Sequence, residues 1–234
     1  MRGLFVTGTD TGVGKTFIAS GLVRALHEEG WRVGVMKPLE TGCAVGQNGL
    51  EPADARVLWE AAGRTQDLAS VCPYRFTAPL APDVAARQAS RHIDPVAIVE
   101  GFQAIAKAHD VVLVEGAGGL LVPIWDRYTM ADLAADLALP LLVVVGSRLG
   151  AVSHTLLTLS HALARGLSVK AYVVNQLSSA VDAAVETNAE LLARSTDVPC
   201  AGTVGCVSPG GDPIAAAAAA VRRAVQIDDL LAKP

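Results

Sequence analysis

Near its N-terminus the chain reads Gly3-Leu-Phe-Val-Thr-Gly-Thr-Asp-Thr-Gly-Val-Gly-Lys-Thr16, and a segment with helical periodicity follows. The apolar run Gly3–Thr7 predicts a buried strand, and the glycine-rich stretch after it predicts a turn whose backbone can approach a phosphate. The amide groups of such a turn and the helix N-terminus face the anion. Lys15 can then reach the β- and γ-phosphates of a nucleotide, and the hydroxyl of Thr16 suits Mg²⁺.

The spacing of this loop differs from the usual phosphate loop by one residue. Five residues rather than four separate Gly8 from Gly14, and Thr9 occupies the usual position of a glycine. The alternative interpretation is a glycine-rich turn between strand and helix that binds nothing. The Gly-Lys-Thr ending in this context favours nucleotide binding, so ATP and Mg²⁺ are the predicted ligands.

Short apolar runs recur along the chain, and segments with helical periodicity separate them. The runs expected as strands are Gly3–Thr7, Val33–Met36, Val111–Val114, Leu141–Val145, Ala171–Val174 and, more weakly, Cys200–Val204. The segments expected as helices are Phe17–Glu29, Pro52–Glu60, Ile93–Ala108, Thr129–Leu139, Ala151–Arg165, Val181–Ala193 and Ala215–Ala220. Because the runs do not alternate with polar residues, they are typical of strands buried on both faces of a parallel sheet. We expect one domain, residues 1–234, with an open, mostly parallel α/β sheet and helices on both faces.

Composition argues against several classes of protein. The chain has 234 residues, a formal charge of −4 and no run rich in Lys or Arg, so no nucleic-acid partner is expected. Its four cysteines form no Cys-x-x-Cys pair, which argues against a zinc site. No apolar stretch is long enough to span a bilayer. We therefore expect a cytoplasmic protein without a membrane partner.

Candidate site residues follow the strands, because open α/β sheets bind ligands beyond the carboxyl ends of their strands. Glu115 follows Val111–Val114 and could hold Mg²⁺ or cap the next turn; the cost of burying an idle acid favours the metal. Lys37 follows Val33–Met36 on the edge where Lys15 is expected. It is either a second cation that stabilises a transferring phosphoryl group or a solvated lysine, and the residues alone leave both open.

Two further polar residues allow two interpretations each. Asp54 lies in the first turn of the expected helix Pro52–Glu60, where an acid simply complements the helix dipole. Asn175 ends the fifth expected strand and could be a turn residue or an amide that reads a base. Neither position alone identifies a function.

Five motifs together resemble one family, the ATP-dependent dethiobiotin synthetases, whose fold is of the P-loop NTPase type. The motifs are Gly8-Thr-Asp-Thr-Gly-Val-Gly-Lys-Thr16, Lys37-Pro-Leu-Glu-Thr-Gly42, Ala78-Pro-Leu-Ala-Pro82, Val114-Glu-Gly-Ala-Gly-Gly-Leu-Leu-Val-Pro123 and Leu149-Gly-Ala-Val-Ser-His-Thr-Leu-Leu-Thr158. They occur in the expected order and span most of residues 3–176. The longer spacing of the phosphate loop is the family's own variant.

The resemblance implies a ring-closing reaction of biotin biosynthesis. One amine of 7,8-diaminopelargonate takes up CO₂ as a carbamate, and the carbamate oxygen attacks the γ-phosphate of ATP. The second amine then attacks the resulting mixed anhydride, closes a five-membered urea ring and expels phosphate. Such a reaction needs a clamp on the γ-phosphate, Mg²⁺ and a site that holds both amines near the terminal phosphate.

The resemblance also implies roles for single residues. Lys15 and Lys37 are the catalytic residues, and Thr16, Asp54 and Glu115 hold Mg²⁺. The residues implied in ATP binding are Gly12, Val13, Gly14, Lys15, Thr16, Phe17, Asp54, Glu115, Gly116, Ala117, Gly118, Asn175 and Gln176, with Asn175 at the adenine. Those implied in substrate binding are Thr11, Lys37, Thr41 and, from the partner subunit of a homodimer, Gly150, Ala151, Val152 and Ser153.

The sequence departs from the family pattern at three places. Gly12 stands where many members carry glutamate, and Ser153 stands where some carry asparagine. Beyond Ala180 the match fades, and Gly202–Val207 only loosely resembles the segment that covers adenine in the family.

Two other classes within the P-loop superfamily compete with this interpretation. ATP-switched partitioning and positioning proteins usually carry a signature lysine early in the loop, at the position of Asp10. Amide ligases of the cobyrinate type need an additional glutamine-hydrolysing domain with a nucleophilic cysteine, for which 234 residues leave no room. The three classes can be distinguished by identifying the small molecule whose presence makes the protein release phosphate from ATP.

Overall fold

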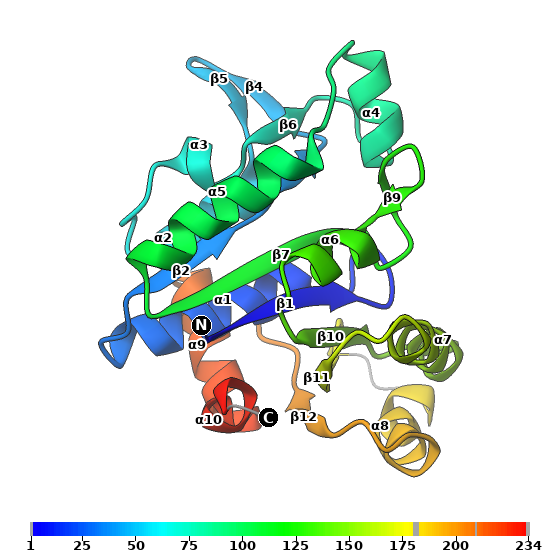
Figure 1. The fold of residues 1–234 in the computed structure, drawn as a ribbon. Coiled ribbons are helices and arrows are strands. Elements are labelled where there is room, and N and C mark those ends of the chain that lie inside the picture. Colours follow the sequence, from blue (N-terminus) through cyan, green and yellow to red (C-terminus); the bar gives the residue numbers. More distant parts are fainter. Residues whose placement is uncertain (1, 180–182, 209, 233–234) are drawn as a thin grey trace.

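A computed structural model describes residues 2–179, 183–208 and 210–232. Its centre is a six-stranded sheet in the order β12-β11-β10-β1-β7-β2, in which every neighbouring pair is parallel (Figure 1). The strands are β1 (Arg2–Gly8), β2 (Val33–Met36), β7 (Val111–Gly119), β10 (Leu141–Gly146), β11 (Val169–Asn175) and β12 (Cys200–Val204). All six expected strands are present, and the weakest of them, β12, is an edge strand.

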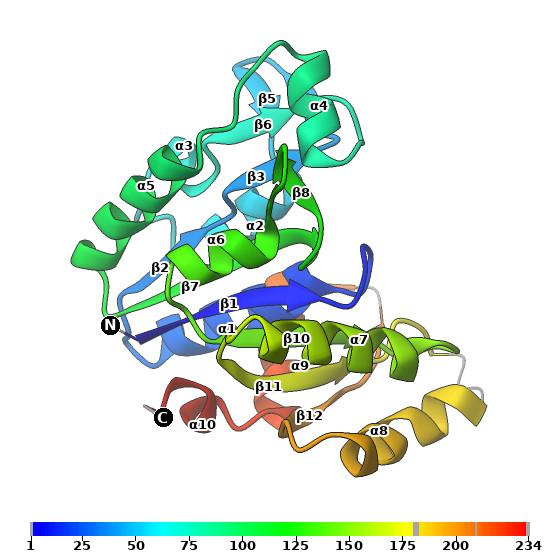
Figure 2. The same ribbon diagram turned by 45° about the vertical axis from the view of Figure 1, so that its right-hand side comes forward.

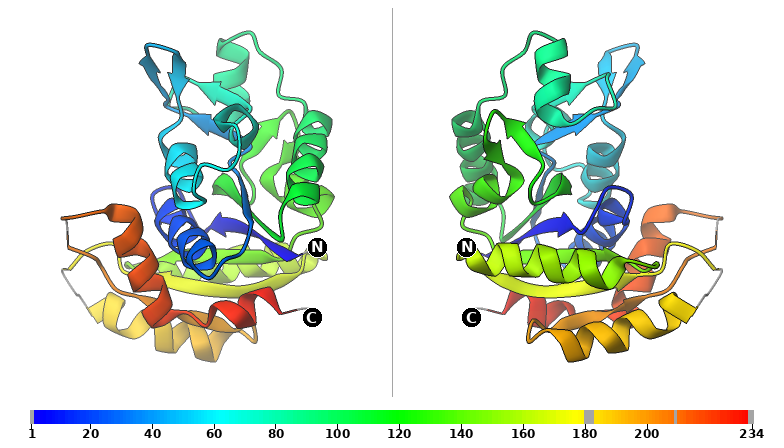
Figure 3. Two further views of the ribbon diagram at one scale, coloured as in Figure 1. Left: turned by 90° about the vertical axis from the view of Figure 1, so that its left-hand side faces the viewer. Right: turned by 90° about the vertical axis from the view of Figure 1, so that its right-hand side faces the viewer.

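Helices cover both faces of the sheet, which explains the uninterrupted apolar runs. The helices are α1 (Lys15–Glu28), α2 (Ala53–Ala61), α3 (Leu68–Val71), α4 (Pro82–Gln88), α5 (Pro95–Ala108), α6 (Met130–Asp136), α7 (Ala151–Ala164), α8 (Ala183–Ser195), α9 (Pro213–Ala224) and α10 (Ile227–Leu231). One core cluster joins the sheet to α1, α2, α9 and α10, and the other joins it to α5, α6, α7 and α8 (Figures 2 and 3). The predicted fold class, an open α/β sheet between two helical layers, is confirmed.

The helix boundaries follow local capping signals. Asp94 accepts a hydrogen bond from the amide of Val96 and starts α5 two residues later than the expected Ile93. The helix expected from Val181 is described only from Ala183, because residues 181–182 lie outside the described residues. The alanine run belongs to the longer helix α9, which packs closely on α1: a Cβ at Gly21 would lie 2.7 Å from the carbonyl oxygen of Ala217.

Several short elements beyond the central sheet were not expected from the sequence. They are the parallel pair β3 (Leu39–Thr41) and β6 (Tyr74–Phe76), the hairpin β4 (Ala44–Gly46) and β5 (Gly49–Glu51), and the hairpin β8 (Pro123–Trp125) and β9 (Tyr128–Thr129). The β3–β6 pair, the β4–β5 hairpin and α4 gather at one end of the molecule, at the top of Figure 1. None of the described helices is both long enough and apolar enough to cross a membrane.

The register of the sheet brings the ends of β1, β2 and β7 together. Met36 of β2 pairs with Val114 of β7, so the next residues along each strand, Lys37 and Glu115, become neighbours. Val6 of β1 pairs with Glu115 itself. Strand β7 continues past Glu115 to Gly119, so this acid lies within the strand rather than directly after it as the sequence suggested.

Candidate active site

The phosphate loop has a curled backbone that depends on glycine. Gly12 and Gly14 have φ angles of 74° and 87°, in the left-handed region that favours glycine. A Cβ at Gly14 would lie 2.1 Å from Nδ2 of Asn175. The same Nδ2 donates a buried hydrogen bond of 3.0 Å to the carbonyl oxygen of Val13. Asn175, at the end of β11, therefore stabilises the conformation of the loop through its hydrogen bond to Val13.

Lys15 is the first residue of α1, and its side chain folds back over the loop. Its Nζ donates to the carbonyl oxygen of Asp10 at 3.0 Å, and the residue is only 6% exposed. Burial and the nearby charge of Lys37 lower the pKa of Lys15. The carboxylate of Asp10 accepts from the amide of Thr11 at 2.7 Å and from Arg148 at 2.5 Å. The loop thus holds a buried cation where a phosphate group would lie.

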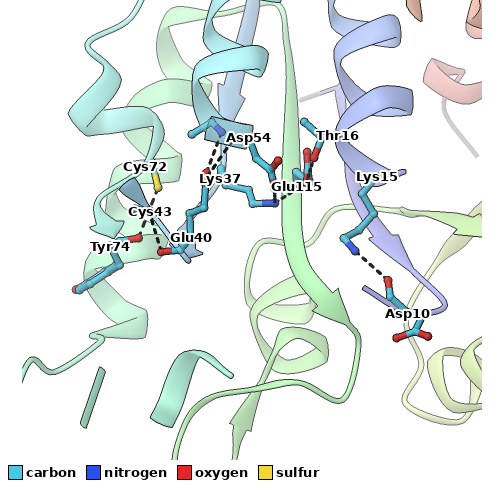
Figure 4. Close-up of polar contacts among 11 residues, drawn as sticks. Asp10, Lys15, Thr16, Lys37, Glu40, Cys43, Asp54, Cys72, Tyr74 and Glu115 are labelled. Carbon is cyan, nitrogen blue, oxygen red and sulfur yellow. Dashed lines mark hydrogen bonds and ion pairs between the residues drawn. The ribbon is translucent and has the colours of Figure 1, made fainter. Parts of the chain in front are cut away.

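Four polar side chains from different elements meet beside this loop (Figure 4). Nζ of Lys37 lies 2.5 Å from Oε1 of Glu115 and 3.0 Å from Oδ2 of Asp54. The hydroxyl of Thr16 donates to the same Oε1 of Glu115 at 2.9 Å. Lys37 is 3% exposed, so the alternative of a solvated lysine is excluded. Asp54 does lie in the first turn of α2, but its carboxylate also belongs to this cluster.

The charge of Lys37 is maintained by its two acidic partners. Burial alone would lower the pKa of this lysine, but the negative charges of Glu115 and Asp54 outweigh burial and raise it above its ordinary value. The two acids therefore favour the charged form of Lys37, which can stabilise negative charge on a bound group.

The oxygen atoms of this cluster fit a magnesium ion. Oε2 of Glu115 is buried and has no hydrogen-bond partner in the structure. The side chain of Asp54 is 46% exposed, and the Thr16 hydroxyl lies beside Glu115. Among the described residues no three His, Cys, Asp or Glu side chains lie close enough together to hold a metal. Two carboxylates and a hydroxyl suit Mg²⁺, which is usually bound by one or two carboxylates together with the phosphates of a substrate.

A cleft of about 790 Å³ opens above the cluster and the loop. Of the residues predicted for the site, those that line it are Thr11, Gly12, Gly14, Lys15, Thr16, Lys37, Thr41, Asp54, Glu115, Ala117 and Gly118. Part of the lining is therefore polar. The lining also includes Pro79–Pro82 and Val122, which are largely apolar. This volume is in the range of small-molecule and cofactor sites.

Comparison with known proteins identifies the family. A family model described as an AAA domain matches residues 2–209. The chain is 50% identical over 196 residues to the ATP-dependent dethiobiotin synthetase BioD of Anaeromyxobacter dehalogenans, which covers 84% of this chain and 86% of the relative. It is 35% identical over 202 residues to the protein of the same name from Bacillus subtilis, with 86% of each chain covered. The chain belongs to the ATP-dependent dethiobiotin synthetase family.

Solved structures of more distant proteins share the fold of this dethiobiotin synthetase family member. A ParA family ATPase from Chlorobium tepidum matches with a TM-score of 0.56 and 11% identity, covering 95% of this chain and 92% of that one. A MinC:MinD cell division protein complex from Aquifex aeolicus matches with a TM-score of 0.56 and 15% identity, covering 95% of each chain. At such low identity the likeness concerns the fold alone.

Some residues implied by the dethiobiotin synthetase resemblance lie outside the cleft. Gly150, Val152 and Ser153 line a separate groove of about 830 Å³ between α7 and α8, and Ala151 is buried. The groove also includes Leu149 and Leu157, which are 86% and 67% exposed. The chain therefore does not bring its own Gly150–Ser153 segment into its own cleft.

The remaining predicted residues do not line the cleft. Val13 is buried, and Phe17 packs against the core cluster on the α1 face. Gly116 lies against the ring of Phe5. The amide of Gln176, next to Asn175, donates to the carbonyl oxygen of Val204 at 2.9 Å. The segment Gly202–Val207 thus begins in β12, directly beside the end of β11.

Glu40 is a feature of the site to which the sequence analysis assigned no role, although the motif Lys37–Gly42 contains it. It is 7% exposed, lines the cleft and accepts backbone hydrogen bonds from Asp54 and Ala55 at 3.0 Å each. No local pattern signals these contacts, because the partners lie 14 and 15 residues farther along the chain.

Proposed function

We propose that this chain is an ATP-dependent cyclo-ligase that converts 7,8-diaminopelargonate and CO₂ to dethiobiotin in biotin biosynthesis. The observation that carries the proposal is the cluster of Lys37, Glu115, Asp54 and Thr16 beside a phosphate loop that contains Lys15. The family's reaction needs fixed positive charge at a phosphoryl group and a metal-binding carboxylate pair, and this cluster supplies both. The 50% identity to a named dethiobiotin synthetase supports the choice of substrate.

The reaction forms two carbon–nitrogen bonds in sequence. One amine attacks CO₂ and loses a proton, which gives a carbamate. A carbamate oxygen attacks the γ-phosphorus, ADP departs, and a carbamic–phosphoric anhydride forms. The second amine then attacks the carbonyl carbon of the anhydride, loses a proton and expels inorganic phosphate as the urea ring closes. The last step is an intramolecular attack, and a site that holds both amines near the terminal phosphate favours it by fixing their orientation.

The residues of the cleft divide this work between them. The loop amides and Lys15 bind the phosphates, and Lys37 stabilises the negative charge of the carbamate and of the transferring group. Thr16, Asp54 and Glu115 would hold Mg²⁺, which neutralises phosphate charge when bound. Thr11 and Thr41, which line the cleft, offer hydroxyl groups to the substrate. The largely apolar lining residues Pro79–Pro82 and Val122 suit the methylene chain of the diamine.

We propose a homodimer in which the turn before α7 serves the neighbouring subunit. The first turn of α7 contains no acid, and its amide groups follow Gly150, whose φ is 91°. A helix start of this kind binds the terminal carboxylate of a long diamine well, and Ser153 adds a hydroxyl donor. The exposed Leu149 and Leu157 beside it suit burial against a second copy. The contact of Asn175 and Gln176 with adenine rests on the family resemblance alone, since neither residue lines the cleft.

Product analysis tests this function directly. Purified protein is incubated with 7,8-diaminopelargonate, bicarbonate, MgCl₂ and ATP, and the ureido product is detected by mass spectrometry. We expect dethiobiotin, ADP and phosphate in equal amounts, and no product when any one reactant is omitted. Folded protein that binds ATP but forms no ureido product would refute the assignment. Phosphate release that does not depend on the diamine would instead favour a partitioning-type ATPase.

A further inference from the structure

The N-terminus of α2 has no capping side chain of its own. Its N-cap residue is Pro52, with extended φ and ψ angles of −81° and 108° and no side-chain hydrogen bond to the helix. The first amide groups of any helix have no partner within it and need acceptors from elsewhere. A capping side chain would normally accept from the second or third helical residue, here Asp54 or Ala55.

Glu40, from strand β3, supplies both of the missing acceptors. Its Oε1 accepts from the amide of Asp54 at 3.0 Å and its Oε2 from the amide of Ala55 at 3.0 Å. The dashed lines in Figure 4 show its carboxylate directed at the start of α2. Glu40 is therefore a cap for α2 that comes from a distant part of the chain.

This contact accounts for a buried acid that would otherwise be costly. Glu40 is 7% exposed, and a buried carboxylate destabilises the fold unless it is paired or hydrogen-bonded. Two charge-assisted hydrogen bonds and the positive end of the helix dipole offset part of that cost, although burial still raises the pKa of Glu40. Glu51, the acid just before the helix, behaves differently: its side chain is 48% exposed and lies 3.5 Å from Arg56.

The capped residue Asp54 is also a member of the lysine cluster. Its amide is held by Glu40 while its carboxylate lies 3.0 Å from Nζ of Lys37. Glu40 and Lys37 lie three residues apart in one segment. This segment therefore contacts Asp54 twice, at its backbone amide through Glu40 and at its carboxylate through Lys37. Both Glu40 oxygens already accept backbone hydrogen bonds, which makes Glu40 a poor ligand for the substrate although it borders the cleft.

We propose that Glu40 is a positioning residue: it caps α2 from β3 and thereby places the Asp54 carboxylate for metal binding beside Lys37. This inference rests on the proposed function only in the role that it gives to Asp54. The cap itself is independent of the reaction and has its own measurement, which is hydrogen exchange at the start of α2.

The test combines removal of the remote cap with insertion of a local one. Glu40→Ala removes both acceptors, and Pro52→Asp introduces a carboxylate at the N-cap that can accept from the same two amides. Pro52→Asp alone and Glu51→Ala, which removes a surface acid before the same helix, are the matched controls. Hydrogen exchange of the peptide covering residues 52–60, calorimetric Mg²⁺·ATP binding and the Mg²⁺ dependence of turnover are measured for each variant.

We expect Glu40→Ala to speed exchange at the start of α2 by about fivefold or more, as for the loss of a helix cap. The Mg²⁺ concentration for half-maximal turnover should rise several-fold, with a smaller effect on the rate at saturating Mg²⁺. The double variant Glu40→Ala/Pro52→Asp should recover both slow exchange and the lower Mg²⁺ requirement. Glu51→Ala should behave as the wild type. Pro52→Asp alone should keep slow exchange at the start of α2, although its new carboxylate, at a buried position beside Glu40, lowers the stability of the fold.

Three results would overturn the inference. Unchanged exchange in Glu40→Ala would show that Glu40 is not the cap. Recovery of slow exchange without recovery of the Mg²⁺ response in the double variant would show that Glu40 acts on the substrate directly. If Glu40→Ala does not fold, it is replaced by Glu40→Gln, which keeps the shape of the side chain and one acceptor oxygen. Normal hydrogen exchange and normal Mg²⁺·ATP binding in Glu40→Gln would contradict the positioning role of Glu40. A wild-type protein that forms no ureido product refutes the proposed function alone, since exchange and Mg²⁺·ATP binding still test the cap.

Discussion

Nζ of Lys37 lies 2.5 Å from Oε1 of Glu115, and the two side chains are 4% and 1% exposed. The register of the sheet produces this contact, because Met36 and Val114, the preceding residues, are partners in neighbouring parallel strands. The pairing of the two backbones, and not only the conformation of the side chains, therefore places Lys37 beside Glu115 at the end of β2. A cation held in this way needs little reorganisation when negative charge develops beside it.

Breaking this pair should destabilise the protein strongly. Removal of one partner of a buried ion pair typically costs about 3–5 kcal/mol, because the other charge is left uncompensated. We expect a loss of that order in the free energy of unfolding of Lys37→Met, measured by urea denaturation. The double variant Lys37→Met/Glu115→Gln should be more stable than Lys37→Met alone. Strictly additive losses would show that the two side chains are not coupled.

The pKa values of the two lysines of the site should be shifted in opposite directions. Burial and Lys37 lower the pKa of Lys15, whereas the acidic partners of Lys37 raise its pKa above the ordinary value. An amine reacts in its neutral form, so a lowered pKa increases the reactive fraction in mildly alkaline solution and a raised pKa decreases it. We expect amine reagents at pH 8–10 to label Lys15 well before Lys37, as mass spectrometry can show.

The control for this titration is the unfolded protein, in which both lysines should react alike. The stabilising charge of Lys37 should be fully present below the unfolded lysine pKa of about 10.4 and lost only as pH rises toward its higher folded pKa. Faster labelling of Lys37 than of Lys15 in the folded protein would contradict the charge assignment.

Replacement of Lys15 should abolish turnover. The loop holds its ammonium group where the transferring phosphate is expected, and loss of one such contact costs about 3 kcal/mol or more in the transition state. Lys15→Ala should therefore lower kcat by about 100-fold or more while the protein remains folded. A nearly normal rate would indicate that the loop has only a structural role.

Glu115→Gln should weaken the use of Mg²⁺ while preserving the fold. The amide keeps the shape of the side chain but removes the charge that a hard cation prefers. We expect the rate to require a several-fold higher Mg²⁺ concentration, measured by titrating MgCl₂ at saturating ATP. If the Mg²⁺ dependence is unchanged, Glu115 does not belong to the metal site.

Mixed dimers should reveal whether sites are shared between subunits. Lys15→Ala disables the phosphate loop, and Gly150→Asp should block the carboxylate site through bulk and negative charge. Each variant alone should be inactive, but heterodimers should regain one intact site in two, because each intact half comes from a different chain. Activity is measured after mixing differently tagged chains and isolating the heterodimer.

The isolated heterodimer also provides the control for this experiment. Both chains must be folded, and each homodimer is assayed beside the mixture. An inactive heterodimer would place the whole site within one subunit, in agreement with a Gly150–Ser153 segment that merely begins a core helix. Restored activity would assign the groove between α7 and α8 to the neighbour's substrate.

The sequence by itself was sufficient for the sheet and the phosphate loop. Each depends on a local pattern: runs of apolar residues predict buried strands, and Gly-Lys-Thr after the first strand predicts a phosphate site. Most other residues of the cleft were implied only by the resemblance to the dethiobiotin synthetase family. The short strands outside the central sheet, which are β3, β6 and the strands of the two hairpins, were not predicted, because strands of two or three residues are too short to show a period. The partners β3 and β6 also lie far apart in the chain, whereas each hairpin pairs neighbouring segments.

Only the tertiary structure decided the contacts of Lys37, Asp54 and Glu40. From the sequence, Lys37 could have been solvated and Asp54 could have been an ordinary acid in a first helical turn. The register of β2 with β7 buries Lys37 beside Glu115, and Glu40 reaches across to cap the helix that carries Asp54. These contacts join residues 14 to 78 positions apart, so no local periodicity encodes them. They arise because parallel strands bring their carboxyl ends to one edge of the sheet, where separate segments must satisfy one another's charges.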